Sequence, residues 1–185
     1  MSKFLAPLEL TLALIKPDVC RNPYSLQLIR EIILEKNFCF VGTKITQLSK
    51  VEAEKFYVEH KNKFFYNRLV TFMSSGLVSA HILAKENAIK DWRALMGPTH
   101  VFKAQYEAPD SIRARFGLTD TRNATHGSDS PDTARREIAF FFPEFSMDDF
   151  YKYHEEAFRN NEVAFDPEHW VHRIRDAKAQ KLQNS

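Results

Sequence analysis

The chain of 185 residues has little of what marks several classes of protein. Two cysteines, Cys20 and Cys39, are too few for a disulfide framework or a four-cysteine zinc site, so we expect reduced thiols. No apolar run reaches the length of a membrane span, and residues 1–7 lack a secretory core. The formal net charge of +2 gives no support to general nucleic-acid binding. We therefore expect a soluble domain without nucleic-acid partners.

Glycine is scarce as well, with five residues, and no glycine-rich phosphate loop follows the first predicted strand. This disfavours a doubly wound parallel sheet, although strands and helices alternate along the chain. Runs of apolar and β-branched residues predict strands over 8–15, 38–45 and 77–83. Helical spacing and a capping Ser49 predict helices over 26–36, 49–57, 65–73 and 86–96. The length and the 44% hydrophobic content suit one compact domain with appendages.

The most informative segment is Asn-Ala-Thr-His-Gly-Ser-Asp-Ser at 123–130, directly before Pro131. Ser130 can cap a helix, and Pro131 suits the first helical position because it has no N–H to leave unsatisfied. A helix therefore begins just after His126, and apolar residues recur along it at helical spacing: Ala134, Ile138 and Phe141 or Phe142. Its amino end directs partial positive charge toward the histidine loop, which favours an anion there.

Three basic residues stand near turns that follow structured segments. Lys16 ends the apolar run 12–15, Arg93 begins a segment that ends at Thr99, and Arg113 lies in Asp-Ser-Ile-Arg. Together with a neutral His126 these cations indicate phosphate chemistry. A hydroxyl near this histidine would also suit a hydrolase, but no nucleophile elbow is present and the cations favour phosphate over an acyl group.

The ordered series of motifs resembles the nucleoside diphosphate kinase family, in particular its divergent type 6 branch. The resemblance spans about residues 8–142 and rests on IKPD at 15–18, YVEH at 57–60, FF at 64–65, FMSSG at 72–76, RALMGPT at 93–99, SIR at 111–113, RNATHGSDS at 122–130 and REI at 136–138. It implies an α+β sandwich in which helices cover a four-stranded antiparallel sheet of ferredoxin-like topology. We divide the chain into an N-terminal extension (1–7), a kinase-like domain (8–145) and a helical C-terminal extension (146–185).

Two further elements are predicted, the last strand of the sheet and a helix in the C-terminal extension. The last strand of the implied sheet would lie near Ala104 or Phe116. In the extension, Asp166-Pro167 predicts the start of a final helix with Trp170, Ile174 and Ala177 on one face, folded back on its own domain. His169 and His172 have a spacing that can hold a metal, but without a matching partner pair we interpret them as surface residues of that helix.

The resemblance implies transfer of the γ-phosphate of a nucleoside triphosphate to a nucleoside diphosphate in two steps. His126 would be phosphorylated at Nδ1 and would then pass the phosphoryl group to the second nucleotide. Glu137 in the following helix would orient the imidazole together with Ser128. Lys16, which we count as catalytic, would also bind the nucleotide phosphates. The resemblance implies further nucleotide-binding residues beside it: Arg93, Arg113, Thr99, Asn123 and Tyr57.

For the base, the resemblance implies stacking on Phe65, which suits an enzyme that accepts many bases because every base has a π-face. Phe64 or Tyr66 could instead take the outward position. Mg²⁺ is expected through the nucleotide phosphates, because the sequence shows no dedicated carboxylate cage. We interpret Asp129 as structural rather than as a metal ligand.

The chain departs from the common family pattern before Arg113. The spacing from Thr99 is three residues longer, Asp110-Ser111 replaces Gly-Thr, and Phe64 stands where proline is usual. These differences leave the placement of Arg113, the intrinsic activity and the homo-oligomeric state open.

The alternative function is a nucleotide-binding protein with weak or partner-dependent kinase activity. It would dock a protein through the loop 100–109 or the C-terminal helix. Composition favours a cytoplasmic location, since the first residues are not arginine-rich, whereas the family resemblance favours mitochondria.

Overall fold

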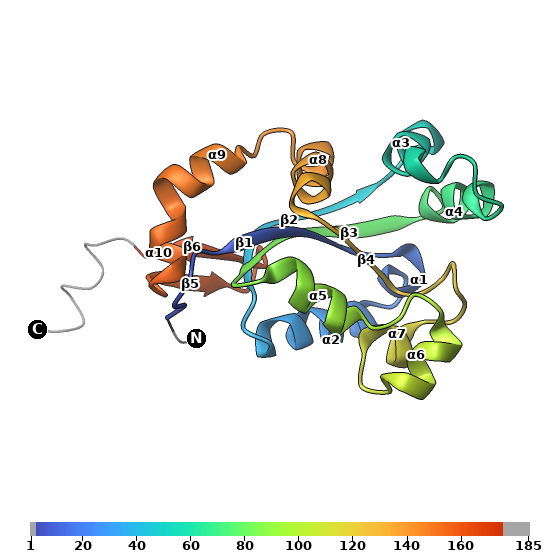
Figure 1. The fold of residues 1–185 in the computed structure, drawn as a ribbon, viewed down its shortest axis with the longest axis horizontal. Helices are drawn as coiled ribbons and strands as arrows, with labels where there is room; N and C mark the ends of the chain where they lie inside the picture. The colour runs from blue at the N-terminus through green and yellow to red at the C-terminus, as the bar shows by residue number, and fades with distance from the viewer. Residues whose placement is uncertain (1–2, 176–185) are drawn as a thin grey trace, which may run out of the picture.

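A four-stranded antiparallel sheet forms the centre of the protein, whose computed structural model describes residues 3–175 (Figure 1). Its strands are β1 (Glu9–Ile15), β2 (Cys39–Gln47), β3 (Leu77–Lys85) and β4 (Thr125–Gly127), in the order β2-β3-β1-β4. All three pairs of neighbours are antiparallel. The three strands predicted from residue pattern are confirmed, and so is the ferredoxin-like sheet.

Helices cover both faces of the sheet because side chains alternate along its strands. Leu10, Leu12 and Leu14 of β1 face α3 (Lys50–Phe56), α4 (Tyr66–Met73) and α8 (Pro131–Phe141). Ala13 and Ile15 face α2 (Pro23–Glu35) and α5 (Ala88–Met96) on the other side. Two apolar cores therefore enclose the sheet, and the predicted helices of this region are confirmed.

The helix starts are set by local capping. Ser49 accepts a hydrogen bond from the Glu52 N–H while the Glu52 carboxylate accepts one from the Ser49 N–H, a complete capping box before α3. Ser130 accepts from the Thr133 N–H at the start of α8, with Pro131 at the first position as predicted. Two short elements, α1 (Pro17–Cys20) and η1 (Val58–His60), follow β1 and α3 in the chain.

The prediction for the last strand of the sheet is wrong. Ala104 lies in α6 (Val101–Glu107) and Phe116 in α7 (Ile112–Phe116), whereas the strand is β4, which contains His126. Val101 and Ala104 are buried one turn apart, as helical packing requires. A strand of three residues is too short to show a period of two in the sequence.

The C-terminal extension is helical only in its first part. That part comprises α9 (Met147–Asp149), the π-helical turn η2 (Phe150–His154) and α10 (Glu155–Arg159). The predicted final helix is wrong, because β5 (Val163–Asp166) and β6 (Val171–Ile174) form an antiparallel hairpin there. Asp166 accepts from the N–H groups of Glu168 and His169, so it caps a turn. Ala177 lies outside the described residues.

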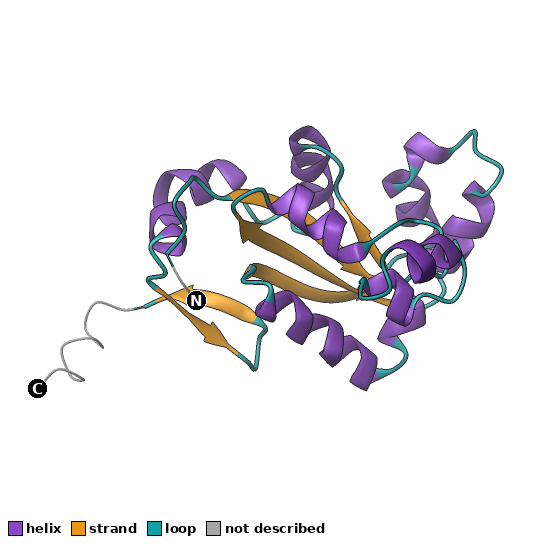
Figure 2. Cartoon of the chain, turned by 60° about the horizontal axis from the view of Figure 1, so that its bottom comes forward, coloured by secondary structure: helices purple, strands orange, loops and turns teal. Residues whose placement is uncertain are grey.

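The hairpin does fold back on its own domain, at the edge formed by β2 (Figure 2). The Phe40 N–H donates to His172 Nδ1 over 2.9 Å, and the Thr43 hydroxyl donates to the Trp170 carbonyl over 2.6 Å. His172 is therefore a buried strand residue and not part of a helix surface. Among residues 3–175, no cluster of three or more His, Cys, Asp or Glu side chains could hold a metal.

Both cysteines are free thiols. Burial raises the pKa of Cys20 to about 11 and that of Cys39 to about 12, so neither is a reactive thiolate. Over the described range, none of the helices has the length and apolar content needed to cross a membrane.

Candidate active site

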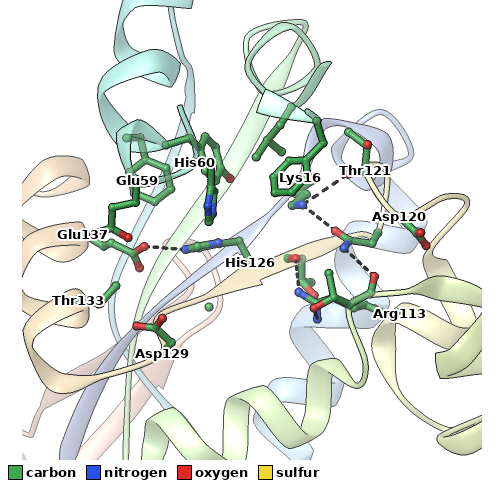
Figure 3. A pocket seen from close by; sticks show the side chains of 18 of the residues that line it. Lys16, Glu59, His60, Arg113, Asp120, Thr121, His126, Asp129, Thr133 and Glu137 are labelled. Carbon is green, nitrogen blue, oxygen red and sulfur yellow. Dashed lines mark hydrogen bonds and ion pairs between the residues drawn. The ribbon is translucent and has the colours of Figure 1, made fainter. Parts of the chain in front are cut away.

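A cavity of about 430 Å³ opens between the α3–α4 segment, β4 and the first turns of α8 (Figure 3). His126, Glu137 and every predicted nucleotide-binding residue contribute to its lining: Lys16, Tyr57, Phe65, Arg93, Thr99, Arg113 and Asn123. These residues come from seven of the sequence motifs quoted above, from IKPD at 15–18 to REI at 136–138. The fold thus brings the predicted set together in one place.

His126 occupies the middle of β4, opposite Leu14 of β1. Its Nε2 lies 2.9 Å from the Glu137 Oε1, and the other carboxylate oxygen accepts a hydrogen bond from the Ser128 hydroxyl over 2.7 Å. An ionised carboxylate can only accept, so the imidazole proton is on Nε2 and the lone pair is on Nδ1. Ser128 is buried behind the ring, where it also accepts from the Leu12 N–H.

The backbone of His126 is held from behind by Trp92 of α5. The fully buried indole donates its N–H to the His126 carbonyl over 3.2 Å. A Cβ on the next residue, Gly127, would lie 2.4 Å from Trp92 Cδ1, so only glycine allows this approach. The His126 ring itself packs edge-on against Phe56 and Tyr57, with centroids 5.3 and 5.9 Å away. The ring is therefore fixed on several sides.

Lys16 follows β1 and is only 5% exposed. Its Nζ donates to the Asn123 side-chain oxygen over 2.6 Å and to the Thr121 carbonyl over 3.5 Å. Burial and the nearby Arg113 charge, opposed by the charge of Asp18, lower the pKa of Lys16 to about 7. A bound anion would compensate this buried charge.

Arg113 reaches the cavity despite the longer spacing before it, and the segment between Thr99 and Arg113 contains α6. Its guanidinium donates to the carbonyls of Gly97 and Thr125 over 2.9 and 3.2 Å, and to the Thr99 hydroxyl over 3.4 Å. Ser111 caps α7 by accepting a hydrogen bond from the Ala114 N–H. Burial and the charge of Arg93 lower the pKa of Arg113 to about 10. Lys16 and Arg113 therefore place two largely buried basic side chains in one site.

The hydroxyl of Tyr57 is buried and has no hydrogen-bond partner within the described part of the chain. Burial, and then the Glu137 charge, raise the pKa of this phenol, so it stays a donor. A buried donor without a partner costs free energy. Its position on the cavity lining suits a ligand oxygen.

The cavity mouth carries two adjacent phenylalanines. Phe64 is 93% exposed, whereas Phe65 is half-buried with its centroid 5.6 Å from the His60 ring. Tyr66 donates its hydroxyl to the Glu54 carbonyl, which takes it away from the outward position. Phe65 as the base platform stays a prediction, with Phe64 beside it at the rim.

The sequence-based set missed several residues that line the same cavity. The Arg136 guanidinium forms a 2.9 Å ion pair with Glu59 and thereby joins α8 to η1 across the cavity. His60, Arg68 and Thr133 also belong to the lining. The motifs YVEH and REI contain three of these five residues. Their position beside Tyr57 and Glu137 was the signal in the sequence that could have identified them as lining residues.

Comparisons with known proteins agree with this geometry. The family model described as nucleoside diphosphate kinase matches residues 9–147. The chain is 50% identical over 172 residues to nucleoside diphosphate kinase 6 of Xenopus tropicalis, covering 93% of this chain and 96% of the relative. It is 51% identical over 167 residues to the human protein of that name, covering 90% of each.

A crystal structure of the Aquifex aeolicus nucleoside diphosphate kinase superposes with a TM-score of 0.71 at 39% sequence identity. The superposition covers 76% of this chain and 96% of that one. Sequence, fold and the arrangement around His126 lead to one assignment: the chain belongs to the nucleoside diphosphate kinase family.

Proposed function

We propose that this protein is a nucleoside diphosphate kinase that carries the phosphoryl group on Nδ1 of His126. The observation that supports this most directly is the carboxylate of Glu137 on Nε2, because it leaves the Nδ1 lone pair for attack. The ring lines the cavity that also contains Lys16 and Arg113. Nucleophile and phosphate-binding cations are therefore parts of one site.

In the first half of the reaction, the Nδ1 lone pair attacks the γ-phosphorus and the bond to the β–γ bridging oxygen breaks. Lys16 and Arg113 neutralise charge on the phosphate oxygens, and the Tyr57 hydroxyl donates to one of them. Glu137 stabilises the positive charge of the phosphorylated ring through the Nε2 proton. In the second half, an oxygen of another nucleoside diphosphate attacks the phosphorus and Nδ1 leaves.

Mg²⁺ belongs to this proposal as an ion carried by the nucleotide. We expect phosphate oxygens and water to hold the ion, because Mg²⁺ in nucleotide sites usually keeps several waters and binds through the phosphates. Asp129 is the lining carboxylate nearest in sequence to His126, and the hydroxyls of Thr133 and Ser130 keep its pKa low. When bound, the ion would neutralise phosphate charge. Glu137 and Ser128, and not the ion, orient His126.

The proposed base site is tolerant of different bases. Phe64 and Phe65 offer flat apolar surfaces at the cavity mouth, and stacking does not depend on the hydrogen-bonding edge of a base. The substrates are therefore nucleoside di- and triphosphates as a class.

A partner-dependent kinase is the second candidate, favoured by the surface of α6. Phe102 and Tyr106 lie one turn apart on this helix and are 81% and 86% exposed. Exposed aromatics at such spacing are common at protein interfaces. In this case the purified chain alone would bind nucleotide and transfer phosphate slowly.

One experiment separates the two. The purified chain is incubated with γ-³²P-ATP and Mg²⁺ and is freed of nucleotide while native. One portion is quenched in alkali and tested for loss of the label in acid, and a second, native portion is chased with unlabelled CDP. Acid-labile label on the wild type that moves to CTP supports the kinase. Nucleotide binding with slow or absent labelling of the purified chain supports the partner-dependent protein.

For location we propose mitochondria, and this rests on the resemblance to the type 6 branch. Fractionation of cells that express the full-length protein tests it. Recovery in the cytosolic fraction alone would contradict it.

A further inference from the structure

The backbone makes an unusual turn at Ala124, directly before β4. Ala124 has a φ of +69°, in the left-handed region that residues with a side chain seldom adopt. The Thr125 N–H donates to the Asn123 carbonyl over 2.8 Å, so the chain makes a γ-turn centred on this alanine. Such a turn with positive φ is rare and strained. It persists only when the surrounding structure holds it.

The turn joins the two halves of the phosphate site. Asn123, directly before Ala124, accepts a hydrogen bond from the Lys16 ammonium. His126 lies on the other side of the turn, two residues after Ala124. A small rotation at Ala124 would therefore change the distance between nucleophile and cation.

Two groups from the segment that follows β1 hold Ala124. Its carbonyl accepts from the Lys16 N–H over 2.8 Å, and its own N–H donates to Asp18 Oδ2 over 3.2 Å. Asp18 is 106 residues away in sequence and lies in α1, a helix of four residues whose start has no side-chain cap. The Asp18 side chain is thus directed to the turn. Ala124 is itself fully buried, so water does not compete for its N–H.

We propose that Asp18 is a positioning residue for phosphoryl transfer: its carboxylate keeps Ala124 in the left-handed turn and so fixes His126 relative to Lys16. This inference rests on the proposed function for its kinetic consequence. Its structural part, the control of the His126 ring by Asp18, does not depend on catalysis.

The test uses four variants of the full chain: Asp18→Ala, Asp18→Asn, Ala124→Gly and the double variant Asp18→Ala/Ala124→Gly. The readouts are the single-turnover rate of His126 phosphorylation by ATP, the affinity for ADP and the ¹H–¹⁵N signals of the His126 ring. Asp18→Ala should slow phosphorylation about tenfold or more, because the released turn relaxes toward an unstrained φ. Asp18→Asn keeps an oxygen that accepts from the Ala124 N–H and should stay close to the wild type.

The decisive comparison is the rescue. Glycine adopts positive φ without steric cost, so the double variant should regain most of the rate and the ring signals of the Ala124→Gly variant. A merely destabilising effect of Asp18→Ala would lower the melting temperature without such a recovery. Rescue of the double variant supports the proposal also where Asp18→Ala alone fails to fold.

Two results would overturn it. Equal losses in Asp18→Asn and Asp18→Ala, without rescue by Ala124→Gly, would show that Asp18 acts through its charge on Lys16. Unchanged ring signals in Asp18→Ala would show that the turn does not need the carboxylate. If the wild type is not phosphorylated, the proposed function fails, and the ring signals still decide the role of Asp18.

Discussion

Two histidines stand at opposite edges of the same sheet and differ in what their ring nitrogens contact. His126 in the edge strand β4 faces the carboxylate of Glu137, an acceptor. His172 lies against the other edge strand, β2, where its Nδ1 accepts from the Phe40 N–H. The first contact fixes the proton on Nε2 and leaves Nδ1 its lone pair, while the second uses the Nδ1 lone pair up.

Burial separates the two rings further. His172 is buried between Phe40 and Phe165, and burial lowers its pKa to about 4, so it remains a neutral structural group. The His126 side chain keeps 22% of its surface exposed, on the lining of the cavity. The comparison teaches that the partner of the ring, donor or acceptor, decides whether a histidine is available as a nucleophile.

The largest expected difference comes from replacing each of the two histidines in turn. His126→Ala should abolish acid-labile labelling and nucleotide exchange, because no other described side chain takes its place beside Glu137. His172→Asn keeps an acceptor for the Phe40 N–H and should retain the kinase activity. Loss of labelling in His172→Asn with an intact fold would contradict the distinction.

The second test removes positive charge from the site of His126. Lys16→Ala should lower kcat/KM roughly a hundredfold to a thousandfold, the scale for one preorganised group that stabilises charge in the transition state. Lys50→Ala is the matched control, since this lysine is exposed at the start of α3. Similar kinetics of the two variants would remove Lys16 from the mechanism.

The third test changes the acceptor beside Nε2. Glu137→Ala leaves the ring and the Ser128 hydroxyl without their partner and should slow phosphorylation of His126 about tenfold to a hundredfold, the scale for a slightly misplaced reacting group. Glu137→Gln retains one acceptor oxygen and should lose less. Stopped reactions with γ-³²P-ATP measure the rates, and equal losses in both variants would point to charge rather than orientation.

The smallest effect concerns stability in acid. The pKa of His172 is lower in the folded chain than its ordinary value near 6.5, so the folded state favours the neutral ring and loses stability as pH falls from about 6.5 toward 4. We expect a loss of about 2 kcal/mol in the free energy of unfolding from this ring. His172→Asn should reduce the loss in urea titrations at pH 7 and pH 4.5. An unchanged pH dependence would contradict the assignment.

Local patterns predicted the elements that are stabilised locally. Ser130 and Pro131 define the start of α8, and the capping box of Ser49 defines the start of α3. The strand β4 and the hairpin gave no such pattern, because each depends on partners far away in sequence. His172 meets Phe40 across 132 residues, and Asp166-Pro167 can begin a turn as well as a helix.

The sequence by itself determined the residue types of the site, their order along the chain and hence the family. Only the tertiary structure decided that Glu137 contacts Nε2 of His126, that burial brings the pKa of Lys16 to about 7, and that Arg113 reaches the cavity despite the longer segment before it. The physical reason is that hydrogen-bond direction and desolvation depend on distances between segments that the chain brings together only when it folds.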